Sequence, residues 1–227
     1  MSLIRAIIFD LDNTLWDVHP VIARAEHALL AFLTAHYPRV VERHDLESMR
    51  ARRVQLALAH PAMRHDFTWL RQESLRLHAQ ECDYPLTMVQ EAFDVFFRAR
   101  NDVVLYDDVR PTLDRLVHTH RLFAISNGNA DLGAIGLADY FEASLSAREA
   151  GMLKPDPRIF DMLLQRSGLR AAEVVHVGDD PEADVEGARG AGVEPVWLNR
   201  DGLPWPCATT PPAIMISTLT SLPAVFQ

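Results

Sequence analysis

The sequence predicts an α/β fold in which a doubly wound parallel sheet carries an inserted helical domain. In the first and last parts of the 227-residue chain, short apolar runs rich in β-branched residues alternate with segments of helical periodicity. This alternation is typical of parallel strands joined by helices. A long stretch after the first apolar run contains only helical patterns. We therefore predict a core made of residues 1–16 and 106–227, with residues 17–105 as a helical cap.

The strands are predicted from their apolar runs, of which the first is "RAIIF" (5–9). Its continuous apolar character indicates a strand that is buried on both faces of a sheet. Four later runs are also interpreted as strands: "RLFAIS" (121–126), "EVVHV" (173–177), "VEPVWLN" (193–199) and "AIMIS" (213–217). Among the helices between them, the one over 156–168 has Asp156 placed as its N-cap and Gly168 at its end.

The stretch from the first strand to about residue 105 is predicted to be helical throughout. Four segments in it place apolar residues at helical spacing: 21–32, 46–56, 67–80 and 87–100. In the last of these, Thr87 and Gln90 have the spacing of a capping box. Because strands and helices alternate on either side of this stretch, we expect a lid inserted into a Rossmann-like core.

Composition and charge exclude several classes of function. The chain is 48% hydrophobic and 23% charged, as soluble globular proteins are, and its net charge of −9 argues against a nucleic-acid partner. Cys82 and Cys207 have no CxxC spacing, which indicates free thiols. We see no signal-peptide pattern and no apolar run near the roughly 20 residues of a membrane span. We expect a cytoplasmic protein with no membrane partner, and no protein partner is indicated.

Polar residues gather where the predicted strands end, which is where ligands bind in open parallel sheets. Asp10 and Asp12 follow the first strand, and their side chains would point the same way if the strand continued. Like charges this close repel one another unless a proton or a cation lies between them. The other residues at this edge are Ser126, Asn127 and Gly128, then Lys154, and then Asp179, Asp180 and Asp184.

These residue types suit a magnesium ion and a phosphate group. Several carboxylates without a histidine or cysteine cluster form a hard oxygen site, which Mg²⁺ prefers. The phosphate oxygens could be held by Lys154, the Ser126 hydroxyl and the amides of Asn127 and Gly128. One carboxylate can attack phosphorus to form an aspartyl-phosphate, and a second can act as general acid and then as base. Asp10 and Asp12 fit these two roles by their spacing.

Four motifs in the chain resemble those of the haloacid dehalogenase superfamily, whose phosphatases form an aspartyl-phosphate. They are "DLDNT" (10–14), "ISN" (125–127), "KP" (154–155) and "GDDPEAD" (178–184). Together they span the core from its first predicted strand onward, and their combination in this order is highly specific. The helical stretch just after the first motif is similar to the small α-helical cap of that superfamily.

The resemblance implies a catalytic role for each of four residues. Asp10 would be the nucleophile, and Asp12 would be the general acid and base. Ser126 would bind the transferring phosphoryl group. Lys154 would neutralise that group and orient Asp10.

The resemblance also implies a magnesium site. Asp10 would bind Mg²⁺ through its carboxylate, and Asp12 through its backbone carbonyl. Asp179 would be a further ligand, and Asp184 would be a ligand or would hold a metal-bound water. The adjacent Asp180 remains an alternative to Asp184, because spacing alone does not separate them.

Three stretches further resemble the bacterial flavin-pathway phosphatases, which act on FMN and on 5-amino-6-(5-phosphoribitylamino)uracil. They are "LWDVHPVIARAE" (15–26), "SNGNADLGAIGLADYFE" (126–142) and "HVGDDPEADVEGARGAGV" (176–193). We therefore expect the substrate to be a small phosphorylated metabolite, with these two compounds as the first candidates. The resemblance is weakest over 45–90, within the cap, where specificity resides in this superfamily.

Other functions stay open at this point. A phosphatase for sugar phosphates or nucleotides, or a phosphomutase, would use the same residues. A haloacid dehalogenase uses the same first aspartate but needs neither a general acid nor a metal, so Asp12 favours phosphoryl chemistry. A protein that binds phosphate without turning it over is the remaining alternative.

The histidines and one arginine of the predicted cap are ambiguous. Arg64, with His60 and His65, could contact the substrate, although a solvated loop is the plainer interpretation. His176 lies on an apolar strand and is interpreted as a buried core residue. The ten histidines of the chain indicate no metal site by their spacing.

Overall fold

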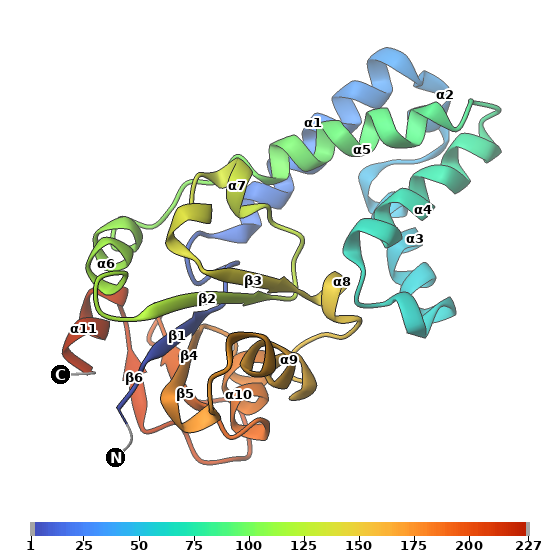
Figure 1. Ribbon diagram of the computed structural model, residues 1–227. Coiled ribbons are helices and arrows are strands. Elements are labelled where there is room, and N and C mark those ends of the chain that lie inside the picture. Colours follow the sequence, from blue (N-terminus) through green and yellow to red (C-terminus); the bar gives the residue numbers. More distant parts are fainter. Residues whose placement is uncertain (1–2, 226–227) are drawn as a thin grey trace. The chain divides into compact units, whose positions relative to one another are not determined.

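The computed structural model describes residues 3–225 and contains a parallel sheet (Figure 1). Within that range the sheet has six strands, in the order β3-β2-β1-β4-β5-β6, and every neighbouring pair is parallel. The strands are β1 (Ala6–Phe9), β2 (Arg121–Ser126), β3 (Ala143–Ser146), β4 (Val174–Gly178), β5 (Glu194–Leu198) and β6 (Ile214–Ile216). The predicted α/β fold with a parallel sheet is confirmed.

The chain divides into two compact units, which we call the sheet unit and the helical unit. The sheet unit is formed by Met1–Asp17 and Val104–Gln227, and the helical unit by Val18–Val103. The helical unit is thus inserted into the sequence of the sheet unit after β1. The sequence analysis places these boundaries after residues 16 and 105.

β1 is the strand on which the sheet unit is centred. It pairs with β2 on one side and with β4 on the other, so that Ile7 lies opposite both Leu122 and Val175. All four of its residues are buried. A strand with neighbours on both edges and helices over both faces has no side exposed to water, which is why its sequence is continuously apolar.

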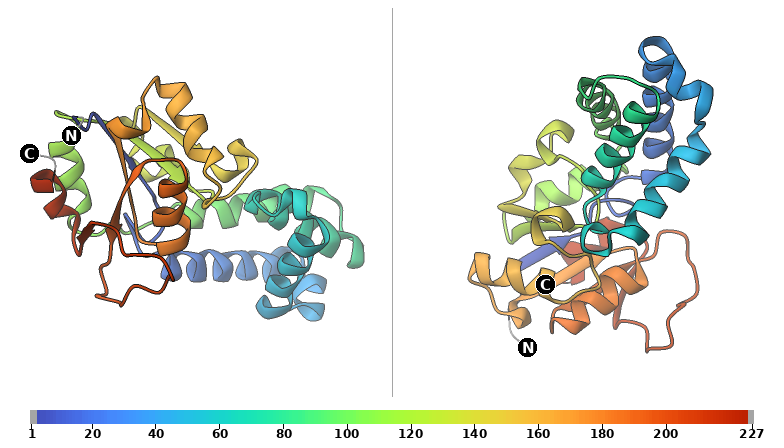
Figure 2. Two further views of the ribbon diagram at one scale, coloured as in Figure 1. Left: turned by 90° about the horizontal axis from the view of Figure 1, so that it is seen from below. Right: turned by 90° about the vertical axis from the view of Figure 1, so that its right-hand side faces the viewer.

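Helices cover both faces of the sheet (Figures 1 and 2). The α-helices of the sheet unit are α6 (Val109–Leu116), α7 (Leu132–Ile135), α8 (Ala147–Ala150), α9 (Arg158–Ser167), α10 (Gly187–Gly190) and α11 (Leu222–Val225). Figure 1 shows α6 and α11 on one face, with α9 and α10 on the other. Ile159 and Phe160 of α9 pack into one buried cluster with Ile8 and Phe123 of the sheet.

The helical unit contains five α-helices within the described part of the chain. They are α1 (Val18–His36), α2 (Pro38–Arg43), α3 (Leu46–Ala59), α4 (Phe67–Glu81) and α5 (Thr87–Arg100). Each predicted helical segment corresponds to one of them, and α2 is a short addition. The unit has its own apolar core, in which Leu29 and Leu33 of α1 pack with Met88 and Phe93 of α5. Among the described residues, no helix is long and apolar enough to cross a membrane.

Three local predictions differ from the structure. The edge strand β3 has no counterpart in the sequence analysis, because it has four residues and two of them are exposed. The predicted capping box of α5 is wrong: Leu86 is the N-cap with helical dihedral angles, so Thr87 already lies inside the helix. Helix α9 begins at Arg158 with Pro157 as N-cap, although Asp156 still accepts a hydrogen bond from the Arg158 amide at 3.1 Å.

Candidate active site

The sheet register brings the ends of β1, β2 and β4 together at one edge. β1 lies between the other two strands, and the Asp10 amide donates a hydrogen bond to the Val177 carbonyl at 2.9 Å. This bond extends the pairing of β1 with β4 by one residue, so Asp10 stands where the strand ends. Its side chain is buried although it carries a carboxylate, and residue Asp10 is only 7% exposed.

Three carboxylates form a cluster at this edge. Asp10, Asp179 and Asp184 each place one carboxylate oxygen within 4.8 Å of the others. Burial raises the pKa of Asp10 well above its usual range, and the nearby Asp184 and Asp179 add to this rise, while Lys154 opposes it. Burial and the charge of Asp184 raise the pKa of Asp179 to about 7. We call these residues the acid cluster.

The acid cluster fits a magnesium ion by its donor set. Its ligand atoms are all carboxylate oxygens, which are the protein ligands that Mg²⁺ prefers. The raised pKa values of Asp10 and Asp179 indicate negative charge that the surrounding protein does not fully compensate. A divalent cation between the carboxylates would supply that compensation. Asp10, Asp179 and Asp184 are thus brought together as their predicted role requires.

Lys154 is the cation that the protein itself supplies to the cluster. Its Nζ donates hydrogen bonds to Oδ1 of Asp10 at 2.5 Å, to Oδ1 of Asp184 at 2.6 Å and to the Ile125 carbonyl at 3.0 Å. Burial opposes its charge, but Asp10 and Asp184 outweigh burial and hold the pKa of Lys154 above its ordinary value. Lys154 is the only lysine of the sequence, and all the other basic residues apart from the histidines are arginines.

Asp184 is held by two further donors and is buried. Its Oδ1 also accepts from His176 Nε2 at 2.9 Å, and its Oδ2 accepts from the Asp180 amide at 2.9 Å. Burial acts to raise the pKa of Asp184, but Lys154 and His176 outweigh it and lower that pKa. Gly178 permits this arrangement, because a Cβ there would lie 2.2 Å from the Asp184 side chain.

Asp180 has a different task. Its Oδ1 accepts hydrogen bonds from the amides of Glu182 and Ala183, both at 2.8 Å, and so caps the helical turn Pro181–Glu186. The acid that joins Asp10 and Asp179 in the cluster is Asp184. Of the two acids that the sequence left as alternatives, Asp180 therefore caps a helical turn and Asp184 belongs to the acid cluster.

Asp12 lies in a tight turn after β1. Its Oδ1 accepts a hydrogen bond from Nε1 of Trp16 at 2.8 Å, and the Asn13 amide donates to the Trp16 carbonyl at 2.7 Å. Asn13 has a φ of 62°, in the left-handed region that asparagine tolerates better than most residues. Trp16 is fully buried and therefore fixes the direction of the Asp12 carboxylate. This contact is not predicted from the sequence.

The residues that follow β2 support each other and the Lys154 loop. Ser126 Oγ accepts a hydrogen bond from the Gly128 amide at 3.0 Å. The Asn127 side chain donates to the Lys154 carbonyl at 3.0 Å and accepts from the Lys154 amide at 2.8 Å. Asn127 was predicted to bind phosphate through its amide, and its side chain holds the backbone of Lys154.

Two residues outside the predicted set hold Asp179. Thr14 Oγ1 donates to its Oδ1 at 2.9 Å, and Trp197 Nε1 donates to its carbonyl at 2.9 Å. Thr14 lies within the first motif, which is the signal that could have identified it. Arg64, the predicted substrate contact of the cap, is exposed in the helical unit and follows the turn Pro61–Met63.

A comparison with protein families matches residues 4–192 to the haloacid dehalogenase-like hydrolases. The chain belongs to this family and is a hydrolase. It is 32% identical to the 5-amino-6-(5-phospho-D-ribitylamino)uracil phosphatase YigB of Escherichia coli, over 98% of this chain and 96% of that protein. It is 28% identical to the human N-acylneuraminate-9-phosphatase, over 100% of this chain and 95% of that protein.

Among solved structures, the chain is similar to one described as a 2-haloacid dehalogenase from Pseudomonas syringae pv. Tomato DC3000. The two chains are 36% identical and superpose with a TM-score of 0.93, covering 98% of each. Named relatives thus include both phosphatases and a dehalogenase, so the choice between these two reactions depends on the site itself.

Proposed function

We propose that the protein is a Mg²⁺-dependent phosphomonoester hydrolase that acts on a small phosphorylated metabolite through an aspartyl-phosphate. One observation carries this proposal: the buried Asp10 is held by Lys154 beside two further carboxylates, and Asp12 follows it at a distance of two residues. Nucleophile, metal ligands, cation and general acid are all present. Phosphoryl transfer depends mainly on such positioning and charge neutralisation.

Asp10 acts as the nucleophile. Lys154 holds its Oδ1, so Oδ2 is the oxygen that we assign to the attack on phosphorus. An Oδ2–P bond forms while the bond from phosphorus to the leaving oxygen breaks, which gives the aspartyl-phosphate. Water then attacks the phosphorus, and the Asp10 carboxylate leaves together with its bonding electrons.

Asp12 acts as the general acid and base. In the first step it gives a proton to the leaving oxygen, and in the second it takes one from the attacking water. Trp16 Nε1 donates to Oδ1 of Asp12 and so orients the carboxyl group that is assigned to carry the proton. The proton that is given up in the first step is recovered in the second, and the enzyme returns to its starting state.

The phosphoryl group and the metal have separate sets of ligands. We assign the phosphoryl oxygens to the Ser126 hydroxyl and the Asn127 amide, while Lys154 neutralises their charge from its place on Asp10. The Gly128 amide would join them only by releasing Ser126 Oγ. The residues that would hold Mg²⁺ are Asp10, Asp179, Asp184 and the backbone carbonyl of Asp12. A bound Mg²⁺ supplies positive charge for the phosphoryl oxygens and for the crowded carboxylates.

Haloacid dehalogenase activity is the second candidate, because a dehalogenase is among the similar structures. Displacement of halide from carbon also uses a carboxylate nucleophile. A halide leaves without a proton, so a dehalogenase has no use for the general acid Asp12. The acid cluster likewise has no role in a reaction that needs no metal. These two features favour phosphoryl chemistry.

For the substrate we propose 5-amino-6-(5-phosphoribitylamino)uracil or FMN. The support is the full-length similarity to the phosphatase YigB, at 32% identity, together with the three stretches that resemble flavin-pathway enzymes. Similarity to an N-acylneuraminate-9-phosphatase supports sugar phosphates as the alternative class. We assign the helical unit as the cap that selects among them.

A substrate panel tests the proposal. Phosphate release is measured from FMN, the phosphorylated flavin precursor, sugar phosphates and nucleoside monophosphates, each with Mg²⁺ and with a chelator. Halide release from 2-haloacids is measured in parallel. We expect phosphate release that the chelator abolishes, led by the flavin compounds. Release led by another class would reject the substrate, and halide release without phosphate release would reject the reaction.

A further inference from the structure

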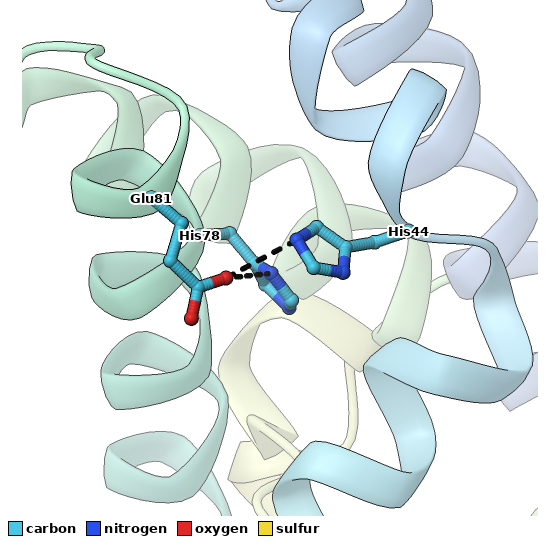
Figure 3. Close-up of side chains that lie close together, drawn as sticks. All are labelled: His44, His78 and Glu81. Carbon is cyan, nitrogen blue, oxygen red and sulfur yellow. Dashed lines mark ion pairs between the residues drawn. The ribbon is translucent and has the colours of Figure 1, made fainter.

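The helical unit brings together two histidines and a glutamate, none of which belongs to the acid cluster. His78 and Glu81 are three residues apart near the end of α4, so they share one face of that helix. His44 is the C-cap residue of α2. One ligand atom from each of the three lies within 4.8 Å of the others (Figure 3). We call these residues the His–His–Glu cluster.

The two imidazoles direct buried nitrogens at one carboxylate oxygen. Nε2 of His44 lies 3.2 Å from Oε2 of Glu81, and Nδ1 of His78 lies 3.9 Å from the same oxygen. Figure 3 marks both contacts with dashed lines. Both nitrogens are buried and form no hydrogen bond within the described residues. The His78 side chain is only 1% exposed. A buried polar atom without a hydrogen bond is costly and calls for an explanation.

We propose that the His–His–Glu cluster is a binding site for one divalent transition-metal ion, of which Zn²⁺ is the best match. Two imidazole nitrogens and one carboxylate oxygen are a common zinc ligand set, with water as the fourth ligand. Magnesium and calcium prefer oxygen ligands alone. The acid cluster offers only oxygens, so the two sites select different metals. This proposal does not depend on the proposed phosphatase function.

The distances are close to those of a tetrahedral site. Zinc bonds of about 2.0–2.1 Å place neighbouring ligand atoms roughly 3.3 Å apart. The two contacts to Glu81 Oε2 are 3.2 Å and 3.9 Å. Small movements of side chains are therefore enough to close the ligands around an ion. Glu81 is 41% exposed in its side chain, which leaves the site open to the fourth, water ligand.

Neighbouring residues orient the ligands as metal sites require. His78 Nε2 lies 3.4 Å from Oγ of the buried Ser74, one turn earlier on α4. If this nitrogen carries the proton, Nδ1 presents its lone pair to the site. Arg52 donates to Glu81 Oε1 at 2.5 Å and leaves Oε2 facing the histidines.

The metal would connect two parts of the helical unit. His44 lies between α2 and α3, whereas His78 and Glu81 belong to α4. An ion that binds the folded form stabilises it against unfolding. The positive charge of Arg52 beside Glu81 and the presence of only three protein ligands predict weaker binding than that of a four-ligand structural zinc site.

Metal titration of the full-length protein tests the site. The protein is stripped with a chelator, supplied with excess Mg²⁺ to fill the acid cluster, and titrated with Zn²⁺ by calorimetry. Co²⁺ is used in parallel, because its visible absorption reports nitrogen ligands and tetrahedral geometry. We expect one equivalent of Zn²⁺ to bind in the presence of Mg²⁺ and to raise the unfolding temperature.

Variants assign the binding to its ligands. His44→Ala and Glu81→Gln should each weaken Zn²⁺ binding at least about tenfold. Glu81 is partly exposed, so its variant tests the site even if His78→Ala fails to fold. His27→Ala, at an exposed position of α1, should leave binding unchanged, and so should Asp179→Asn in the acid cluster. The proposal would be overturned if no Zn²⁺ bound in the presence of excess Mg²⁺, or if Zn²⁺ binding were lost only in Asp179→Asn.

Discussion

At the residue scale, the positive charge of Lys154 offsets the repulsion between the buried carboxylates of Asp10 and Asp184. It lies between Asp10 and Asp184, and its own charge is stabilised by both. A buried charge that loses its partner is far less stable than one in a complete pair. The site therefore depends on a single ammonium group with a flexible stem, in a chain that otherwise uses arginine.

Lys154→Met should abolish turnover and lower the free energy of unfolding by about 3–5 kcal/mol, because it removes the ammonium that holds the buried Asp10 and one of the three donors to Asp184. Lys154→Arg should also lose most activity, since the planar guanidinium does not fit the space of a compact ammonium. Steady-state kinetics and urea unfolding at neutral pH measure both effects. Retained activity in either variant would contradict the role of Lys154.

A second prediction at this scale concerns pH and the metal. The pKa of Asp179 is raised to about 7, chiefly by burial, so below pH 7 this carboxyl mostly carries a proton. Mg²⁺ must displace that proton, and its affinity should therefore fall as the pH drops below 7, by about tenfold per pH unit for this one proton. Mg²⁺ titrations at several pH values measure this. An affinity that is constant from pH 5 to pH 8 would contradict the assignment.

The Thr14→Val variant tests whether Asp179 is the group that governs the pH dependence of Mg²⁺ affinity. The Thr14 hydroxyl donates to Asp179 and lowers the pKa of that carboxyl, so its removal should move the break in Mg²⁺ affinity to higher pH. Thr34→Val, at an exposed position of α1, is the matched control. The same break in both variants would show that another group governs the pH dependence.

At the element scale, the strand ends supply the site residues, and the turns after them fix their directions. β4 ends at Gly178, where the absence of a side chain lets Asp184 fold back toward Lys154. Gly168 ends α9 in the left-handed region with a φ of 68°, where a Cβ would meet nothing within 4 Å. Gly178 is required because a side chain has no space there, whereas Gly168 is required because of its positive φ. Substitution by alanine should therefore have a different effect at each position.

Gly178→Ala should abolish turnover, because the added Cβ would lie 2.2 Å from Asp184 and displace it from Lys154 and His176. Gly168→Ala should cost about 1 kcal/mol of stability through its positive φ, with activity per folded molecule unchanged. Activity and thermal unfolding of the two variants are compared directly. Full activity of Gly178→Ala would show that the position of Asp184 is not critical.

Much of the fold could be predicted because its signals are local. Helical periodicity and apolar runs identified four cap helices and five strands, whereas β3 is too short and too exposed to leave such a signal. The motif residues Asp10, Lys154, Asp179 and Asp184, which the structure brings together, were named from the sequence, and their catalytic roles stay predictions. Their supporting contacts were not, because the Trp16 contact depends on the tight turn at Asn13 and His176 reaches Asp184 only in the folded chain. His44 and His78 also come together only in the fold of the helical unit. Spacing alone gave no reason to expect a histidine site.

At the scale of the whole molecule, the four motifs and the inserted helices belong to different units. The sheet unit holds the four motifs, and the inserted helical unit has its own apolar core. We propose that the helical unit determines which phosphorylated metabolite is accepted. Arg64, exposed after the turn Pro61–Met63, is the residue assigned to this selection.

Arg64→Ala should change the ranking of phosphorylated metabolites while leaving activity on a small aryl phosphate within about twofold, because a guanidinium recognises substrate groups that an aryl phosphate lacks. Arg98→Ala, an exposed arginine of α5, is the control. The ratio kcat/KM is measured for each compound. An unchanged ranking would remove Arg64 from the specificity site.

The central claim is that Asp10 becomes phosphorylated during turnover, and chemical trapping tests it most directly. The Asp12→Asn variant is mixed with an aryl phosphate and Mg²⁺. Its good leaving group needs no acid, so the intermediate forms, and the missing base slows its hydrolysis. Borohydride then reduces the acyl-phosphate to an alcohol. We predict that peptide mass spectrometry finds reduction at Asp10, and none when a chelator replaces Mg²⁺. Phosphate release without reduction at Asp10 would contradict the mechanism.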